Sequence, residues 1–210
     1  MDNPESEVIG ILGLAGTAAK AVNRPLSRYL LLVEVAVCAA RKGQIGIAEG
    51  ILVEISSELE RLTGFDRIMV SAECGYALNL AGHNADGDRL LLEAQRAANE
   101  MPNWLERTGI LSKLVEIYCD LGRHAQAESV AEHIESPPHK SAVLTTLARK
   151  YMAAGLLEAA LHTTTRMLEA SVVLTEIVLK ILEGEHIGEH ETRLIQMIRL
   201  RLSTHPDEED

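Results

Sequence analysis

Apolar residues recur along most of this chain at intervals of three and four, the spacing of one face of an α-helix. The pattern is clearest between positions 111 and 134, where two apolar stripes flank a glycine at 122. The stripes consist of Leu111, Leu114, Val115 and Tyr118, followed by Ala127, Val130, Ala131 and Ile134. A glycine at a helix C-terminus adopts a positive φ without strain. The segment therefore predicts two helices joined by a tight turn.

The same arrangement occurs four times. Gly43, Gly82, Gly122 and Gly155 lie 33 to 40 residues apart, and a small residue follows each of them five positions later. A repeat of this length made of paired helices indicates a solenoid, in which each unit packs mainly against its neighbours. Such arrays present extended surfaces, so the pattern favours binding over catalysis.

The repeats resemble the tetratricopeptide repeat (TPR) family. The third and fourth units carry its small, aromatic, glycine and alanine positions, namely Val115, Tyr118, Gly122 and Ala127, then Ala148, Tyr151, Gly155 and Ala160. The first two units match more loosely, because Ala39 and Leu78 replace the aromatic residue. The resemblance covers residues 27–170. It implies an all-α, right-handed α-solenoid of about four TPR-like helix-turn-helix repeats, with capping helices at both ends.

Four parts of the chain are expected. They are an N-terminal apolar capping helix (1–26), the four repeats (27–170), a degenerate C-terminal helix pair (171–203) and a disordered acidic tail (204–210). The apolar run 8–22 follows acidic residues, unlike a signal peptide, and is shorter than the roughly 20 residues that span a bilayer. Its glycines at every third position would let another helix approach closely.

Composition narrows the range of partners. The net charge of −11 disfavours nucleic acids and anionic membranes, and suits a basic partner. The three cysteines, an odd number without paired spacing, argue against a disulfide framework and for a cytoplasmic protein. The chain is therefore expected to bind protein or peptide, with no nucleic acid and no membrane.

By the TPR resemblance, the first helix of each pair lines a concave groove, and its outward positions contact the ligand. The predicted groove consists of Leu30, Val33, Val37, Met69, Tyr76, Asn79, Glu116, Asp120 and Arg149. Its N-terminal half is apolar and its C-terminal half polar. The implied function is a non-catalytic adaptor, scaffold or chaperone that buries an amphipathic helix, while Glu116 and Asp120 select a basic segment. Small acidic proteins of this kind include chaperones of bacterial secretion systems.

The segment 29–40 is apolar nearly all round, so a helix there needs a cover on every side. Three covers are open at this point: the chain's own N-terminal helix, a second copy of the protein, or a partner's amphipathic helix. The second would make the chain a structural homo-oligomerisation module that assembles through its apolar first repeat.

Two other functions have some support in the sequence. His186, Glu189 and His190 match the H-x-x-E-H pattern of inverted zinc peptidases, but Gly188 interrupts a helix there and only twenty residues follow.

The third and fourth units also resemble pentatricopeptide repeats, which bind RNA. The positive charges of Arg41 and Arg149 at the outward positions are, however, cancelled by the negative charges of Glu116 and Asp120. No enzyme activity, cofactor or metal is therefore expected.

Overall fold

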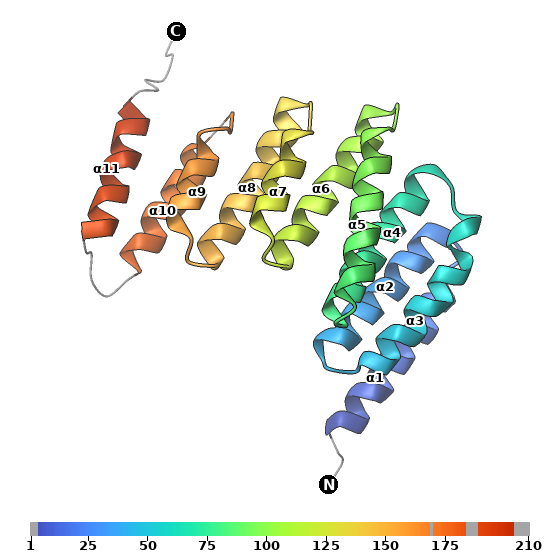
Figure 1. Cartoon of the computed structure of the whole chain (residues 1–210). Coiled ribbons are helices and arrows are strands. Elements are labelled where there is room, and N and C mark those ends of the chain that lie inside the picture. Colours follow the sequence, from blue (N-terminus) through green and yellow to red (C-terminus); the bar gives the residue numbers. More distant parts are fainter. Residues whose placement is uncertain (1–3, 169, 184–188, 204–210) are drawn as a thin grey trace. The chain divides into compact units, whose positions relative to one another are not determined.

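The computed structural model describes residues 4–168, 170–183 and 189–203, and every regular element in those ranges is a helix (Figure 1). The α-helices are α1 (Pro4–Lys20), α2 (Pro25–Arg41), α3 (Ile45–Glu58), α4 (Gly64–Leu80), α5 (Asn84–Asn99), α6 (Trp104–Asp120), α7 (His124–Glu132), α8 (Pro137–Ala153), α9 (Leu157–Thr164), α10 (Ser171–Leu182) and α11 (Glu189–Ser203). A short 3₁₀ helix, η1 (Leu59–Arg61), follows α3.

The four repeated glycines end the first helix of each pair. Gly43, Gly82, Gly122 and Gly155 have φ between 71° and 91°. In each turn the following amide donates to the carbonyl five residues earlier, as Gln44 N does to Ala39 O at 2.9 Å and Arg123 N to Tyr118 O at 2.8 Å. This is the Schellman arrangement, which satisfies the last carbonyls of a helix. The predicted helix-glycine-helix turn is confirmed at all four positions.

The chain divides into two compact units, Met1–Ile117 and Tyr118–Asp210, with the boundary inside α6. In the first unit, α2 packs against α1, α3 and α4, and α4 packs closely against α5. The largest side chains buried there include Leu32, Ile55 and Leu91. Helix α2 therefore has neighbours on most sides, as its sequence requires.

The contact between α4 and α5 depends on two glycines. A Cβ atom added at Gly75 would lie 2.9 Å from Gly87 O, and one added at Gly87 would lie 2.7 Å from Gly75 O. The amide of Asn79 donates to Gly75 O at 3.0 Å inside the same contact. The two backbones thus touch without intervening side chains, which no other residue pair permits.

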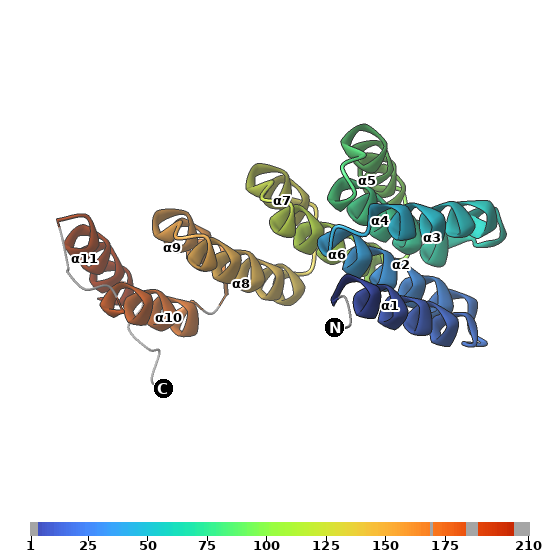
Figure 2. The same ribbon diagram turned by 90° about the horizontal axis from the view of Figure 1, so that it is seen from below.

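Of the three covers considered for α2, the chain's own N-terminal helix is present, because α1 packs against α2 (Figure 2). Leu12 and Ala19 of α1 are buried in the same core cluster as Val33 of α2. Lys20 Nζ at the end of α1 lies 2.7 Å from Glu54 Oε2 of α3. The helix lies within the segment 1–26 that was expected to cap the array.

In the second unit, α8 and α9 form a pair, α10 packs against both, and α11 packs against α9 and α10. Its core includes Leu144, Leu147, Ile177, Leu194 and Ile198. Helices α10 and α11 occupy the segment 171–203, where the closing pair was expected. The predicted tail 204–210 lies outside the described residues.

None of the helices in the described ranges is both long enough and apolar enough to cross a membrane.

Candidate interaction surfaces

The outward stripe of α2 lies one residue away from the predicted one. Beyond Pro25 at its start, the exposed positions of the helix are Ser27, Leu31, Glu34, Cys38 and Arg41. Val33, which was placed in the groove, is only 1% exposed, while Leu30 and Val37 are half-buried. The cause is tertiary, because α1, α3 and α4 together cover α2 on every side but this exposed stripe.

Helix α4 presents little free surface. Tyr76 and Asn79 are buried and Met69 is half-buried. Asn79 belongs to the α4–α5 contact, whereas the Tyr76 hydroxyl accepts a hydrogen bond from the Arg41 guanidinium, which lies 5.8 Å from the ring centre. A partner that bound the predicted apolar half would therefore touch Leu30, Val37 and Met69 and little of the rest.

The charged positions of the predicted groove, Glu116, Asp120 and Arg149, are exposed, and each pairs with a charged residue of the same chain. Lys113 Nζ lies 2.9 Å from Glu73 Oε1 and 3.4 Å from Glu116 Oε2. Lys150 of α8 binds Asp120 of α6, and Arg149 donates two hydrogen bonds to Glu176 of α10, at 2.9 and 2.6 Å. Ion pairs therefore join successive first helices inside each unit.

These pairs shift the protonation equilibria of their members. Burial lowers the pKa of Lys113, but the hydrogen bond and charge of Glu73, together with Glu116, outweigh this effect and raise it overall. The hydrogen bond from Arg149 lowers the pKa of Glu176, and the same bond raises the pKa of Arg149. The pKa shifts of Lys113, Arg149 and Glu176 all favour the charged form. A ligand at Glu116 or Asp120 must compete with an existing partner, Lys113 or Lys150.

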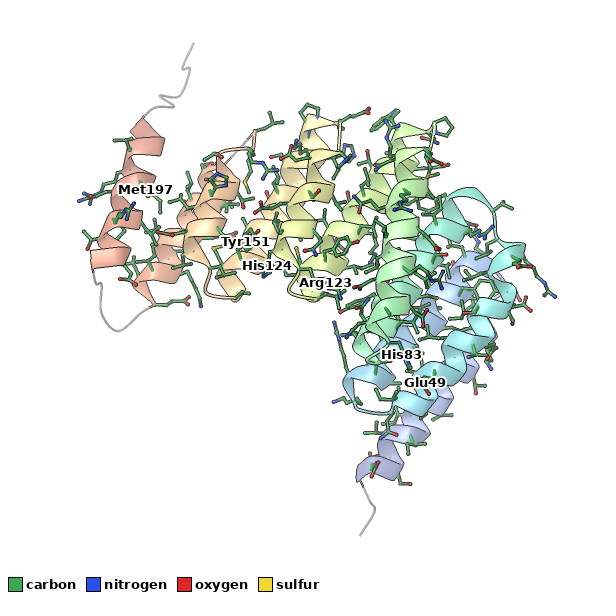
Figure 3. The ribbon with its side chains drawn as sticks, in the orientation of Figure 1. Glu49, His83, Arg123, His124, Tyr151 and Met197 are labelled. Carbon is green, nitrogen blue, oxygen red and sulfur yellow. The ribbon has the colours of Figure 1, made fainter. Side chains whose placement is uncertain are left out.

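A hollow that the sequence analysis missed lies between α9 and α11. It has a volume of about 550 Å³ and is lined by Glu158, Leu161, His162, Thr165, Arg193, Met197 and Leu200. Leu161 is buried at its floor, while Met197 and Leu200 are exposed on α11. Figure 3 shows Met197 on this helix. We call this surface the α9–α11 groove.

A signal for the α9–α11 groove was present in the sequence of the last helix. Leu194 and Ile198 face the core, while Met197 and Leu200 lie on another side and are exposed. A surface helix normally has one apolar stripe, so a second stripe indicates a second contact.

Tyr151 and Cys74 are held in their protonated forms, and His124 packs against Tyr151. His124 lies against Tyr151, with ring centres 4.8 Å apart (Figure 3), and its Nδ1 is buried without a hydrogen-bond partner. Burial and the hydrogen bond to Glu128 raise the pKa of the Tyr151 hydroxyl, so it stays protonated. Burial, with the charge of Glu73, raises the pKa of Cys74 to about 12, which makes it a poor nucleophile.

The zinc pattern falls mostly outside what the structure describes. His186 lies in the segment 184–188, and for Glu189 and His190 the structure gives only the backbone at the start of α11. Among the residues with described side chains, no three His, Cys, Asp or Glu side chains are grouped so that they could hold a metal ion.

No protein-family model matches this chain, and no curated protein sequence matches it. The solved structures do contain similar folds. One is a crystal structure of nearly identical TPR-like repeats, in a point variant, from a Podosopora anserina protein that is named provisionally as a kinesin light chain. It is 18% identical, covers 87% of this chain and 98% of its own, and has a TM-score of 0.50.

The chain has a TPR-like repeat fold. At 18% identity the similarity shows the fold alone, and it confirms the all-α helical-repeat fold predicted from the sequence. A second structure of the same Podosopora anserina repeats is also 18% identical. It covers 89% of this chain and all of its own, but its TM-score of 0.48 is too low to support an argument.

Proposed function

We propose that this chain is a non-catalytic protein-binding scaffold that holds a segment of a partner in the α9–α11 groove. The observation that supports this role is the groove itself, about 550 Å³ of space with an apolar floor and charged residues among those that line it. Hollows of this size accommodate several large side chains. The TPR-like fold supports a binding role in general, because helical repeats present extended surfaces to partners.

The lining of the groove suits an amphipathic helix. Leu161, Met197 and Leu200 offer apolar contact to anchors spaced three and four residues apart. Met197 adds adaptability, because an unbranched thioether side chain fits differently shaped anchors. Glu158 and Arg193 line the groove from opposite helices and carry opposite charges, which suits a partner with both signs of charge.

The predicted first-helix groove is the second candidate surface for the same function. Its free apolar area is small, because Val33 and Tyr76 are buried, and its charges at Asp120 and Arg149 are paired within the chain. The same pairing supports a partner other than nucleic acid, since Arg149 and Lys150 already face carboxylates. An adaptor or chaperone role in the cytoplasm is the finer form of this proposal.

Selection from a display library of short amphipathic helical peptides tests the proposal, with affinities then measured by fluorescence anisotropy. Met197→Asp should weaken the binding of selected peptides by at least about tenfold, because it places a charge in an apolar contact. Leu179→Asp is the matched control, since Leu179 of α10 is 56% exposed, comparable to Met197 at 49%, but does not line the groove. Circular dichroism verifies that both variants keep their helical content.

The outcomes separate the two surfaces. Loss of binding in Met197→Asp alone supports the α9–α11 groove, whereas loss in Val37→Asp alone moves the site to the first helices. Equal loss in Met197→Asp and Leu179→Asp, or a library that yields no binder, contradicts the proposal.

A further inference from the structure

The methionines of this chain differ sharply in their exposure to solvent. Met197 on α11 is 49% exposed, whereas Met101 and Met152 are only 9% and 8% exposed. Met69 and Met167 are half-buried. Among the described residues, Met197 is therefore the methionine that a dissolved oxidant reaches most readily.

Met197 also lines the α9–α11 groove. It does so together with Leu161, which is buried at the floor, and with Leu200, which lies three residues further along α11. A partner's apolar anchor that enters the groove would cover the thioether of Met197, as the proposed function requires. Exposure in the free chain and burial in the complex are thus combined at one side chain.

Oxidation of a thioether to a sulfoxide changes the chemistry of this position. A peroxide transfers one oxygen atom to the sulfur in a two-electron step, so the thioether becomes a sulfoxide and the peroxide is reduced to water or an alcohol. The product carries a strongly polar S–O bond whose oxygen accepts hydrogen bonds. A partner's apolar anchor offers no donor to that oxygen, and burial of an unsatisfied polar group is unfavourable.

The free chain, by contrast, accommodates the added oxygen. Met197 is exposed, so water can donate a hydrogen bond to the oxygen. Arg193 lies four residues earlier on α11, on the same side of the helix, and lines the same groove. Its guanidinium carries only donors, which suits a sulfoxide oxygen. Because oxidation penalises the occupied groove more than the empty one, it shifts the binding equilibrium toward the free chain.

We propose that Met197 is a reversible oxidation site, and that its sulfoxide form releases the partner from the α9–α11 groove. This inference rests on the proposed function, because it assigns a redox control to the same groove. The oxidant is a peroxide, and the reverse step uses a thiol-dependent methionine sulfoxide reductase. In the reverse step two thiols become a disulfide, the sulfoxide oxygen leaves as water, and the thioether is restored.

Peptide mapping by mass spectrometry identifies the oxidation site on the full chain without any partner. Every chain carries Cys38→Ser, because Cys38 is an exposed cysteine that peroxide would also oxidise. Brief treatment with hydrogen peroxide should convert Met197 to the sulfoxide at least about tenfold faster than Met101 or Met152. Equal rates at the three positions would overturn the assignment of Met197 as the oxidation site.

Fluorescence anisotropy then tests the redox control, with the peptides selected for the groove as probes. Oxidation of the chain should weaken their binding by at least about fivefold, and treatment with the reductase and dithiothreitol should restore it. The matched variant is Met197→Leu, which removes the thioether and keeps an apolar side chain. Its affinity is compared before and after peroxide treatment, and the two values should agree whatever the starting affinity of the variant.

The outcomes separate this inference from the proposed function. Oxidation of Met197 that leaves peptide affinity unchanged overturns the redox control and leaves the groove as a binding site. An equal loss of affinity in oxidised Met197→Leu, or a loss of helical content measured by circular dichroism, also overturns it. A library that yields no binder contradicts the proposed function, and the redox control falls with it. The peptide map still decides whether Met197 is the oxidation site.

Discussion

The first helices α2 and α4 differ from α6 and α8 in what joins them to their neighbours. Helices α2 and α4 contact their neighbours mainly through buried apolar residues such as Val33 and through the Gly75–Gly87 approach, with polar links at Arg41–Tyr76 and Glu73–Lys113. In α6 and α8 exposed ion pairs such as Asp120–Lys150 and Arg149–Glu176 connect one first helix to the next. One sequence motif therefore produces two kinds of surface, one closed by packing and the other covered by charges that pair.

The difference coincides with how well the repeats match the motif. The third and fourth repeats carry the aromatic residue and glycine of the TPR pattern, and there Glu116, Asp120 and Arg149 are exposed as predicted. The first two repeats match loosely, and Val33, Tyr76 and Asn79 are buried instead. A family pattern therefore locates outward positions only where neighbouring elements leave the helix face open.

The largest expected effect comes from a substitution in the apolar contacts of α2. Val33→Asp should lower the free energy of unfolding by about 3 kcal/mol or more, because Val33 is buried and a carboxylate there has no partner. Leu31→Asp, two residues away on the exposed stripe, should change it by about 0.5 kcal/mol or less. Urea denaturation measures both values. Equal effects would contradict the burial of Val33 and the exposure of Leu31.

The second effect concerns the close approach of α4 and α5. Gly87→Ala should destabilise the protein by about 1–3 kcal/mol, because the new Cβ atom would lie 2.7 Å from a backbone oxygen that cannot move alone. Gly46→Ala in α3 meets no atom within 4 Å and should stabilise by up to about 1 kcal/mol. Opposite signs in thermal unfolding support the packed contact, whereas two stabilising substitutions would contradict it.

The smallest expected effect comes from removing one of the exposed ion pairs. Glu176→Gln should cost less than about 1 kcal/mol at neutral pH, because the pair with Arg149 is exposed. Since Arg149 lowers the pKa of Glu176, the contribution of this pair is present above the ordinary glutamate pKa of about 4.3. It is lost as pH falls through the lowered folded-state value.

Denaturation of the native chain and Glu176→Gln across the acidic range measures this difference. The gap in stability between the two should close at low pH and shrink at high salt. A gap that persists at the lowest pH would mean that Glu176 acts through packing and not through its charge.

The sequence by itself determined the helical elements and their turns. Apolar spacing marked the helices, and a glycine with positive φ ends the first helix of each pair, because both signals are local and depend on residues within one or two turns. The same locality explains why the polar positions Glu116, Asp120 and Arg149 could be placed on an outward face.

The tertiary structure alone decided which faces stay open. Burial of Val33 depends on the helices that pack around α2, and the α9–α11 groove depends on two helices that α10 separates in sequence. A periodic pattern shows that a helix has an apolar side, but it does not show what covers that side. Coverage is a property of packing between distant segments. The second apolar stripe of α11 could be read from the sequence, but that Met197 and Leu200 stay open beside α9 is decided only by the tertiary structure.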